Sequence, residues 1–287
     1  MPFPTLRNYL ARLPGATQAG TSVWLDAEGR AQGRYFNSTL TSAFQAVRAV
    51  GSNAITAYEA FVRSYSETDQ GLSLWKLLDH AANDDESIEL DRLCRMLHAI
   101  NFFRQPEALG ADLLVSVHAR LLAAVDSNHG IAFSRILNAL ELPQEKVVLQ
   151  LPAVVEQQRW LLNYVSDNYR RNGFRFAVNA ANVKEARDLL ERVRPDVMKV
   201  DARELAAHRA TVKLLSDCSS LGVQVIFKRV ENIETLNILN ELTVNNGQTI
   251  YAQGFLWDSP KASLTPAGTP GDGMPAPTVP ISPVGAH

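Results

Sequence analysis

Five polar side chains stand where short apolar segments of the sequence end, and they are the residues best placed to do chemistry. They are Ser116, Gln150, Asn179, Lys228 and Gln253. In a barrel of parallel strands, the carboxyl ends of the strands carry the active site. A hydrolase that depends on magnesium or manganese needs several anionic oxygen ligands there, and carboxylates are nearly missing from this set. The pattern is therefore typical of a site that binds a ligand rather than one that cleaves it.

The spacing of apolar residues predicts strands that alternate with helices from about residue 55. We expect strands at 55–63, 113–118, 147–151, 174–178, 197–200, 223–227 and 249–255, and helices that include 73–84 and 87–104. Strands that are apolar throughout and separated by helices indicate a parallel sheet covered on both faces. Seven or eight such units favour a closed barrel. No glycine-rich phosphate-binding loop follows any of these strands, which argues against dinucleotide and P-loop folds.

The two ends of the chain depart from this pattern. Residues 1–40 are predicted to form an N-terminal extension, with a helix at 5–13 and a hairpin that turns at Glu28 and Gly29. Residues 41–262 are the expected barrel domain. Residues 263–287 are rich in proline and lack apolar periodicity, so we expect a disordered tail.

Composition limits the classes of function. A chain of 287 residues with 46% hydrophobic side chains can bury one substantial core. Its net charge is −2 and it has no dense run of lysine or arginine, so we expect no nucleic-acid partner. No window approaches the roughly 20 apolar residues of a membrane span, and the N-terminus lacks the apolar core of a signal peptide. Cys94 and Cys218 lie singly in apolar helical contexts, which predicts structural thiols and a cytoplasmic protein without a membrane anchor.

A series of motifs in order resembles the EAL domain family, the bacterial phosphodiesterases and receptors of cyclic di-GMP. Residues 43–63 resemble the opening strand, the turn and the signature strand of that family, with Glu59, Phe61 and Arg63 in the places of its Glu, Leu and Arg. The segments IELDRL (88–93), RPDVMKVD (194–201) and YAQGFLWDSP (251–260) are similar to three further motifs. The resemblance covers about residues 40–262 and implies an α/β fold, a (β/α)8 TIM-like barrel of EAL type.

The departures from the family pattern concern its two catalytic metals. The resemblance places metal ligands at Glu59 and Gln253, which are retained, and at positions where the ligand is lost, namely Ser116, Gln150, Asn179, Ala180 and Lys228. An ammonium group at Lys228 would repel a cation and could occupy its place. Lys199 matches a lysine that lies beside the nucleophilic water in active members; here it could contact a ligand phosphate or pair with an acid such as Asp201 or Glu59. The resemblance thus implies no bound metal, no cofactor and no phosphodiesterase activity.

Ligand binding is a separate question. Some degenerate relatives bind cyclic di-GMP without metal, and the matching contact positions are Gln45, Arg63, Asp91 and Gln253, to which we add Glu59, Phe61 and Lys199. Phe61 is larger than the leucine it replaces, so it could stack on a base or block the pocket. Alternatively, Glu59 and Arg63 could form a purely structural salt bridge at the rim.

Three functional hypotheses follow. The first is a catalytically inactive EAL-type domain that acts as a signalling or regulatory module through a protein partner, with cyclic di-GMP as a candidate ligand. The second is an active phosphodiesterase, and the third is another barrel enzyme with Lys199 as a Schiff-base nucleophile. The loop that contributes to dimerisation in EAL domains reads NAANVKEA here, so a homodimer is left open.

Several other residues are given ordinary roles. His118 and His129 lack a cluster that could hold a metal. Trp160, Leu161 and Tyr164 are expected to pack on the barrel, and residues 228–242 to lead into an amphipathic helix.

Overall fold

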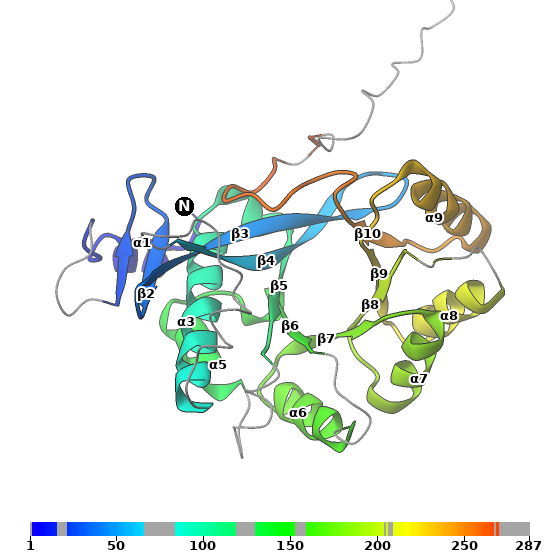
Figure 1. Ribbon diagram of the computed structural model, residues 1–287, viewed down its shortest axis with the longest axis horizontal. Helices are drawn as coiled ribbons and strands as arrows, with labels where there is room; N and C mark the ends of the chain where they lie inside the picture. Colours follow the sequence, from blue (N-terminus) through cyan, green and yellow to red (C-terminus); the bar gives the residue numbers. More distant parts are fainter. Residues whose placement is uncertain are drawn as a thin grey trace, which may run out of the picture.

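A closed barrel of eight strands forms the centre of the molecule (Figure 1). The computed structural model describes residues 2–15, 22–65, 84–118, 130–152, 159–203, 205, 209–266 and 268–269. The barrel strands are β3 (Ser38–Ala49), β4 (Ile55–Tyr65), β5 (Asp112–Ser116), β6 (Val147–Leu151), β7 (Arg175–Ala180), β8 (Val197–Asp201), β9 (Gln224–Lys228) and β10 (Tyr251–Gln253). Strands β4 to β10 pair in parallel with their neighbours along the chain. The predicted EAL-type barrel is therefore confirmed.

The first barrel strand, β3, runs against all the others. It pairs antiparallel with β4 on one side and with β10 on the other, and so closes the barrel. A tight turn joins β3 to β4, with Gly51 and Asn53 in the left-handed conformation and a hydrogen bond from Asn53 N–H to the Ala49 carbonyl. Such a short connection can join only antiparallel strands, because a parallel pair needs a long crossover. The expectation of a wholly parallel sheet is wrong at this strand.

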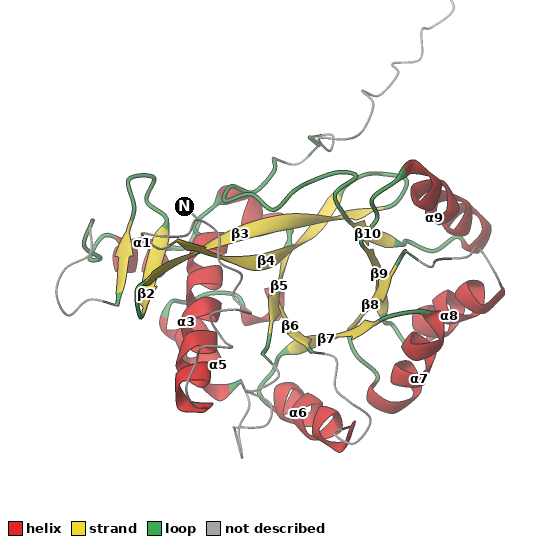
Figure 2. Cartoon of the chain, in the orientation of Figure 1, coloured by secondary structure: helices red, strands yellow, loops and turns green. Residues whose placement is uncertain are grey.

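Helices cover the outside of the barrel (Figure 2). They are α3 (Asp84–Phe103), α5 (Ile131–Ala139), α6 (Arg159–Arg171), α7 (Val183–Val193), α8 (Arg209–Ser220) and α9 (Ile233–Asn246), with short 3-10 turns at Pro106–Gly110 and Gln144–Lys146. The side chains of Asn182 and Asn232 cap the amino ends of α7 and α9. The helix expected at 73–84 lies almost wholly outside the described residues. Among the described helices, none is both long enough and apolar enough to cross a membrane.

The interior of the barrel is filled near the amino ends of its parallel strands by one layer of apolar side chains. The layer comprises Val47, Ala57, Leu114, Val148, Ala177, Val197 and Ile226, with Tyr251 packed against them. Side chains on a strand alternate between faces, so residues two positions apart point the same way. The next interior layer towards the open end must therefore come from the neighbours at two positions further along each parallel strand.

The N-terminal extension continues the sheet outward from β3. Strand β1 (Val23–Leu25) pairs antiparallel with β2 (Ala31–Tyr35), and β2 pairs with β3, so the predicted hairpin is confirmed. The predicted helix is shorter than expected and spans α1 (Pro4–Leu10).

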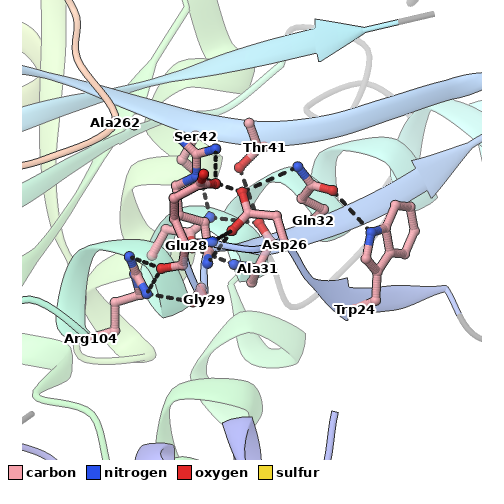
Figure 3. A network of polar contacts seen from close by, with 12 residues as sticks. Trp24, Asp26, Glu28, Gly29, Ala31, Gln32, Thr41, Ser42, Arg104 and Ala262 are labelled. Atoms are coloured by element: carbon pink, nitrogen blue, oxygen red, sulfur yellow. Dashed lines mark hydrogen bonds and ion pairs between the residues drawn. The ribbon is translucent and has the colours of Figure 1, made fainter. Parts of the chain in front are cut away.

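Side chains at the carboxyl end of α3 and directly after it hold this hairpin in place (Figure 3). Asn101 bonds to both backbone groups of Ala31, each at 2.8 Å, and the guanidinium of Arg104 donates to the carbonyls of Glu28 and Gly29. Trp24 Nε1 donates to Gln32 Oε1 at 3.0 Å across the hairpin. Strand pairing and these hydrogen bonds make the hairpin part of the barrel's own framework.

The chain after β10 stays in contact with the first two barrel strands. Lys261 forms a backbone bridge to Phe44, and the buried Arg48 guanidinium donates to the Asp258 carboxylate at 2.9 Å. Further along, the hydroxyl of Tyr58 donates to the Thr265 carbonyl at 2.7 Å, and Arg48 reaches the Thr269 carbonyl at 3.0 Å. Contact therefore continues beyond residue 263, where the sequence predicts the tail to begin; residues 270–287 lie outside the described residues.

Candidate functional site

A ring of polar side chains lies directly above the apolar layer, one from each barrel strand. We call it the polar ring; its members are Gln45, Glu59, Ser116, Gln150, Asn179, Lys199, Lys228 and Gln253. Each lies two positions from a residue of the apolar layer, so strand alternation points all of them into the barrel, closer to its open end. The register sets Ser116 beside Gln150, Asn179 beside Lys199 and Lys228 beside Gln253. The strand-end residues picked out in the sequence do meet in space.

Ala180 is the exception among the predicted positions. It points to the other face of β7 and is buried in the core between the barrel and the helices.

The polar ring forms the floor of a cavity of about 910 Å³. This volume lies within the range of pockets that hold small organic ligands. Higher walls of the cavity include Phe61, Arg63, Asp91, His118 and Phe255. Of these, Phe255 is 66% exposed, so an aromatic face is available at the rim.

Four members of the polar ring form one hydrogen-bonded group in which every charge has a partner. We call this group, Glu59, Ser116, Gln150 and Lys199, the paired half. Lys199 Nζ lies 2.8 Å from Glu59 Oε2 and donates to Gln150 Oε1 at 2.7 Å. Gln150 Nε2 donates in turn to Glu59 Oε1 at 2.9 Å and to Ser116 Oγ at 3.3 Å. The amide and the ammonium group together occupy both oxygens of the carboxylate.

This arrangement keeps Glu59 ionised. Burial on its own raises the pKa of a carboxyl group. The charge of Lys199 and the hydrogen bonds from Lys199 and Gln150 outweigh that cost, so the pKa of Glu59 lies below its ordinary value. The side-chain amide of Gln253 faces the same carboxylate and lowers this pKa further, although its Nε2 makes no hydrogen bond of normal geometry.

A second group of ring members is short of acceptors. We call this group, Asn179, Lys228 and Gln253, the open half. Lys228 Nζ donates to Asn179 Oδ1 at 2.9 Å, and within the described residues it forms no ion pair. Gln253 is 3% exposed, and its Nε2 has no hydrogen-bond partner in the described part of the chain. Burial and the nearby charge of Lys199 lower the pKa of Lys228.

Gly254 fixes the position of Gln253. The backbone there passes so close to the Val230 carbonyl that a Cβ atom would collide with it. Leu256 N–H also donates to Val230 O, and Val230 N–H donates to Gln253 O. A glycine is needed at this crossing of two chain segments, which explains the Gln-Gly pair physically.

Among the expected pairings of charged residues, that of Lys199 with Glu59 is confirmed and the alternatives are wrong. The carboxylate of Glu59 is paired with Lys199, so Lys228 does not take the place of a metal beside it, and no Glu59–Arg63 bridge forms. Arg63 is exposed and donates to the Pro260 carbonyl at 3.3 Å. Asp201 does not pair with Lys199 either, because it accepts from Arg203 and Arg229.

The remaining predicted ligand contacts are partly engaged within the protein. Gln45 Nε2 donates to the Asp258 carbonyl at 2.7 Å. Asp91 forms a buried ion pair with Arg95 and accepts from the His118 N–H at 3.1 Å. Both residues line the cavity, but part of their hydrogen-bonding capacity is already used.

The other residues given ordinary roles are mostly as expected. Cys94 and Cys218 are buried free thiols, and burial raises the pKa of both, that of Cys218 to about 12, so neither is an active nucleophile. Leu161 packs on the barrel, but Trp160 and Tyr164 are 67% and 40% exposed, which corrects the expectation for them. His129 lies outside the described residues.

Sequence reasoning missed two residues of the cavity wall. His98 on α3 accepts or donates a hydrogen bond with Ser42 at 2.8 Å, and burial lowers its pKa to about 3, so it is neutral. Phe255 directly follows the Gln-Gly pair at the end of a predicted strand, and this position was the signal available for it in the sequence.

The β/α barrel with one reversed strand, together with the polar ring below its open end, is the architecture by which the class of this protein can be defined. The EAL domain model matches residues 30–260, so the chain belongs to the EAL domain family. No curated protein matches it.

Solved structures show the same fold at low identity. One is BlrP1 of Klebsiella pneumoniae in a manganese and cyclic di-GMP complex, with 21% identity, a TM-score of 0.64, and coverage of 88% of this chain and 59% of that one. BlrP1 with FMN and cyclic di-GMP but no metal ions has a TM-score of 0.58 at 21% identity, covering 88% and 56%. The FimX EAL domain of Pseudomonas aeruginosa bound to cyclic di-GMP has a TM-score of 0.64 at 16% identity, covering 78% and 91%. The chain thus spans about three fifths of the length of BlrP1.

Proposed function

We propose that this protein is a non-catalytic EAL domain that works as a signalling module by binding rather than by hydrolysis. The observation that carries the proposal is the ion pair of 2.8 Å between Lys199 and Glu59. Glu59 is the only carboxylate in the polar ring, all of whose members are described. Its two oxygens already accept from protein donors, so the carboxylate serves the fold.

A divalent-metal pair does not fit these residues. Manganese, magnesium and calcium take hard oxygen ligands, and catalytic pairs of metals are held by several carboxylates. The polar ring offers one carboxylate against the two ammonium groups of Lys199 and Lys228. Two positive charges at this level would raise the electrostatic cost of placing cations there. We therefore derive no hydrolytic step through metals, and the residues present include no activated nucleophile to replace one.

The ligand that we propose is cyclic di-GMP, bound without metal. All three of these solved structures are complexes with cyclic di-GMP, and one BlrP1 complex holds it without metal ions. The cavity of about 910 Å³ has room for a small nucleotide and ends in a rim with Phe61, Arg63 and Phe255. Since a binding module releases no product, we propose that its output passes through a protein partner.

Two measurements test this function together. Purified protein is incubated with cyclic di-GMP and Mn²⁺ or Mg²⁺, and the linear product is followed by chromatography. We expect no turnover, whereas turnover that Glu59→Ala abolishes would establish the active phosphodiesterase instead. Isothermal titration with cyclic di-GMP in EDTA should show saturable binding. An absence of heat at protein concentrations of tens of micromolar would reject the receptor role.

A further inference from the structure

The open half of the polar ring contains donors without matching acceptors. Lys228 has three ammonium protons, and its one hydrogen bond within the described residues goes to the neutral amide of Asn179. Gln253 lies beside Lys228 in the β9–β10 register, and its buried Nε2, although it faces Glu59, makes no hydrogen bond of normal geometry in the described residues. A buried donor without a hydrogen bond costs free energy, so a site that keeps one beside a partly buried ammonium group is suited to an acceptor from outside.

We propose that the open half is an anion site, in which Lys228 and Gln253 bind a nucleotide phosphate directly, with no metal between them. The proposal rests on the ligand-binding function above and deepens it, because it names the two side chains that bind the phosphate and the ammonium group that supplies the positive charge. Where a metal would bridge two anions, here the protein itself supplies the positive charge.

The charges around the cavity agree with an anionic ligand. Glu59 and Lys199 neutralise each other, which leaves the Lys228 ammonium as the uncompensated charge of the polar ring. Asp91 also faces the cavity but is paired with Arg95, and Arg229 is paired with Asp201.

Two further charged side chains lie towards the opening. Glu231 and Arg63 are both exposed cavity residues, so water screens them more strongly than it screens Lys228. A phosphate at the floor would give Lys228 the anionic partner that it lacks.

The shape of the cavity favours a nucleotide over a bare anion. Its floor is lined by polar side chains, and its rim carries the aromatic rings of Phe61 and Phe255. Aromatic faces stack on bases, and a planar guanidinium such as that of Arg63 can bind a second phosphate through two parallel hydrogen bonds. Phosphate at the floor and base at the rim use both parts of the cavity at once.

The test compares ligands and variants in EDTA by isothermal titration. The ligands are cyclic di-GMP, GMP and inorganic phosphate, which separate a cyclic dinucleotide from a mononucleotide and from a free anion. The variants are Lys228→Gln, Lys228→Arg and Gln253→Met, with Lys213→Gln on the exposed face of α8 as the matched lysine control. Circular dichroism and the urea midpoint establish that each variant is folded.

We expect Lys228→Gln to weaken nucleotide binding roughly tenfold or more, as for loss of a hydrogen bond to a charged group. Lys228→Arg should stay within a few-fold of the wild type, Gln253→Met should weaken binding less than Lys228→Gln, and Lys213→Gln should change nothing. Raising the salt concentration should weaken binding to the wild type more than to Lys228→Gln.

The outcomes separate this proposal from the proposed function. Cyclic di-GMP binding that is equal in wild type, Lys228→Gln and Gln253→Met would overturn the anion site and leave the receptor role standing. Binding of GMP or phosphate that requires Lys228, without binding of cyclic di-GMP, would support the anion site and overturn the receptor role. No binding of any of the three ligands would overturn both.

Discussion

The two halves of the polar ring are built from similar residues and yet differ in what they leave unsatisfied. Each half has a lysine that donates to an amide oxygen: Lys199 to Gln150 at 2.7 Å, and Lys228 to Asn179 at 2.9 Å. Only Lys199 also has a carboxylate, at 2.8 Å. The comparison teaches that one acidic residue decides which lysine serves the fold and which remains available for a ligand.

Burial follows the same division. Lys199 is 1% exposed, because its charge is balanced inside the barrel, whereas Lys228 at the end of β9 is only partly buried. A buried charge is tolerated when it is paired and hydrogen-bonded. The difference between the halves therefore makes opposite predictions for substitutions at the two lysines.

The largest effect is expected for Lys199→Met. Removal of the ammonium leaves the buried carboxylate of Glu59 without its counter-ion, and breaking a buried pair in this way costs about 3–5 kcal/mol. The free energy of unfolding from urea denaturation at pH 7 should fall by that amount.

The double variant Glu59→Gln with Lys199→Met is the control, because it removes both charges and keeps the volumes similar. It should recover most of the lost stability. A single-variant loss below about 1 kcal/mol would mean that the pair is not what holds the paired half together.

A smaller effect, dependent on pH, is expected for Glu59→Gln. At neutral pH the loss should be about 1–3 kcal/mol, less than for Lys199→Met, because the new amide oxygen can still accept from the Lys199 ammonium, which also keeps its hydrogen bond to Gln150. Because the folded pKa of Glu59 is lowered, its ionised form contributes stability above the ordinary value of about 4.3, and this contribution is lost as pH falls through the folded pKa. The difference in unfolding free energy between wild type and variant should shrink over that interval. A difference that is constant, or that grows towards acid pH, would contradict the assigned pairing.

The sequence predicted the barrel and its polar mouth because both follow from local patterns. Apolar runs place Gln150 and Lys228 at strand ends, and the resemblance to EAL domains adds Glu59, so the three could be assigned to one site before their distances were known. The partner of each charge could not be predicted. Lys199 and Lys228 both lie on interior faces of neighbouring strands, and the sequence does not say which of them reaches Glu59.

The reversed strand and the C-terminal contacts could not be predicted either, because local sequence patterns do not reveal them. The antiparallel pairing of β3 depends on a turn of a few residues, and the contact of Arg48 with Asp258 joins positions far apart in the chain. Neither has a periodic signature. Likewise Thr265 and Thr269 lie in a proline-rich segment, but their carbonyls accept from Tyr58 and Arg48, which composition alone does not reveal.

The smallest change in stability, and the sharpest contrast with Lys199→Met, is expected for Lys228→Met. Without ligand, this substitution removes a partly buried charge that has no anionic partner in the described residues and that lies near the like charge of Lys199. The loss of the hydrogen bond to Asn179 offsets that gain, so the free energy of unfolding at pH 7 should stay within about 1 kcal/mol of the wild type or rise.

The same variant should lose the stabilisation that a bound nucleotide gives to the wild type, which thermal unfolding with and without cyclic di-GMP measures. A residue kept at no benefit to stability is the expected mark of a functional site. A loss of 3 kcal/mol or more in the unliganded protein would instead make Lys228 a structural counterpart of Lys199, and the distinction between the two halves would fail.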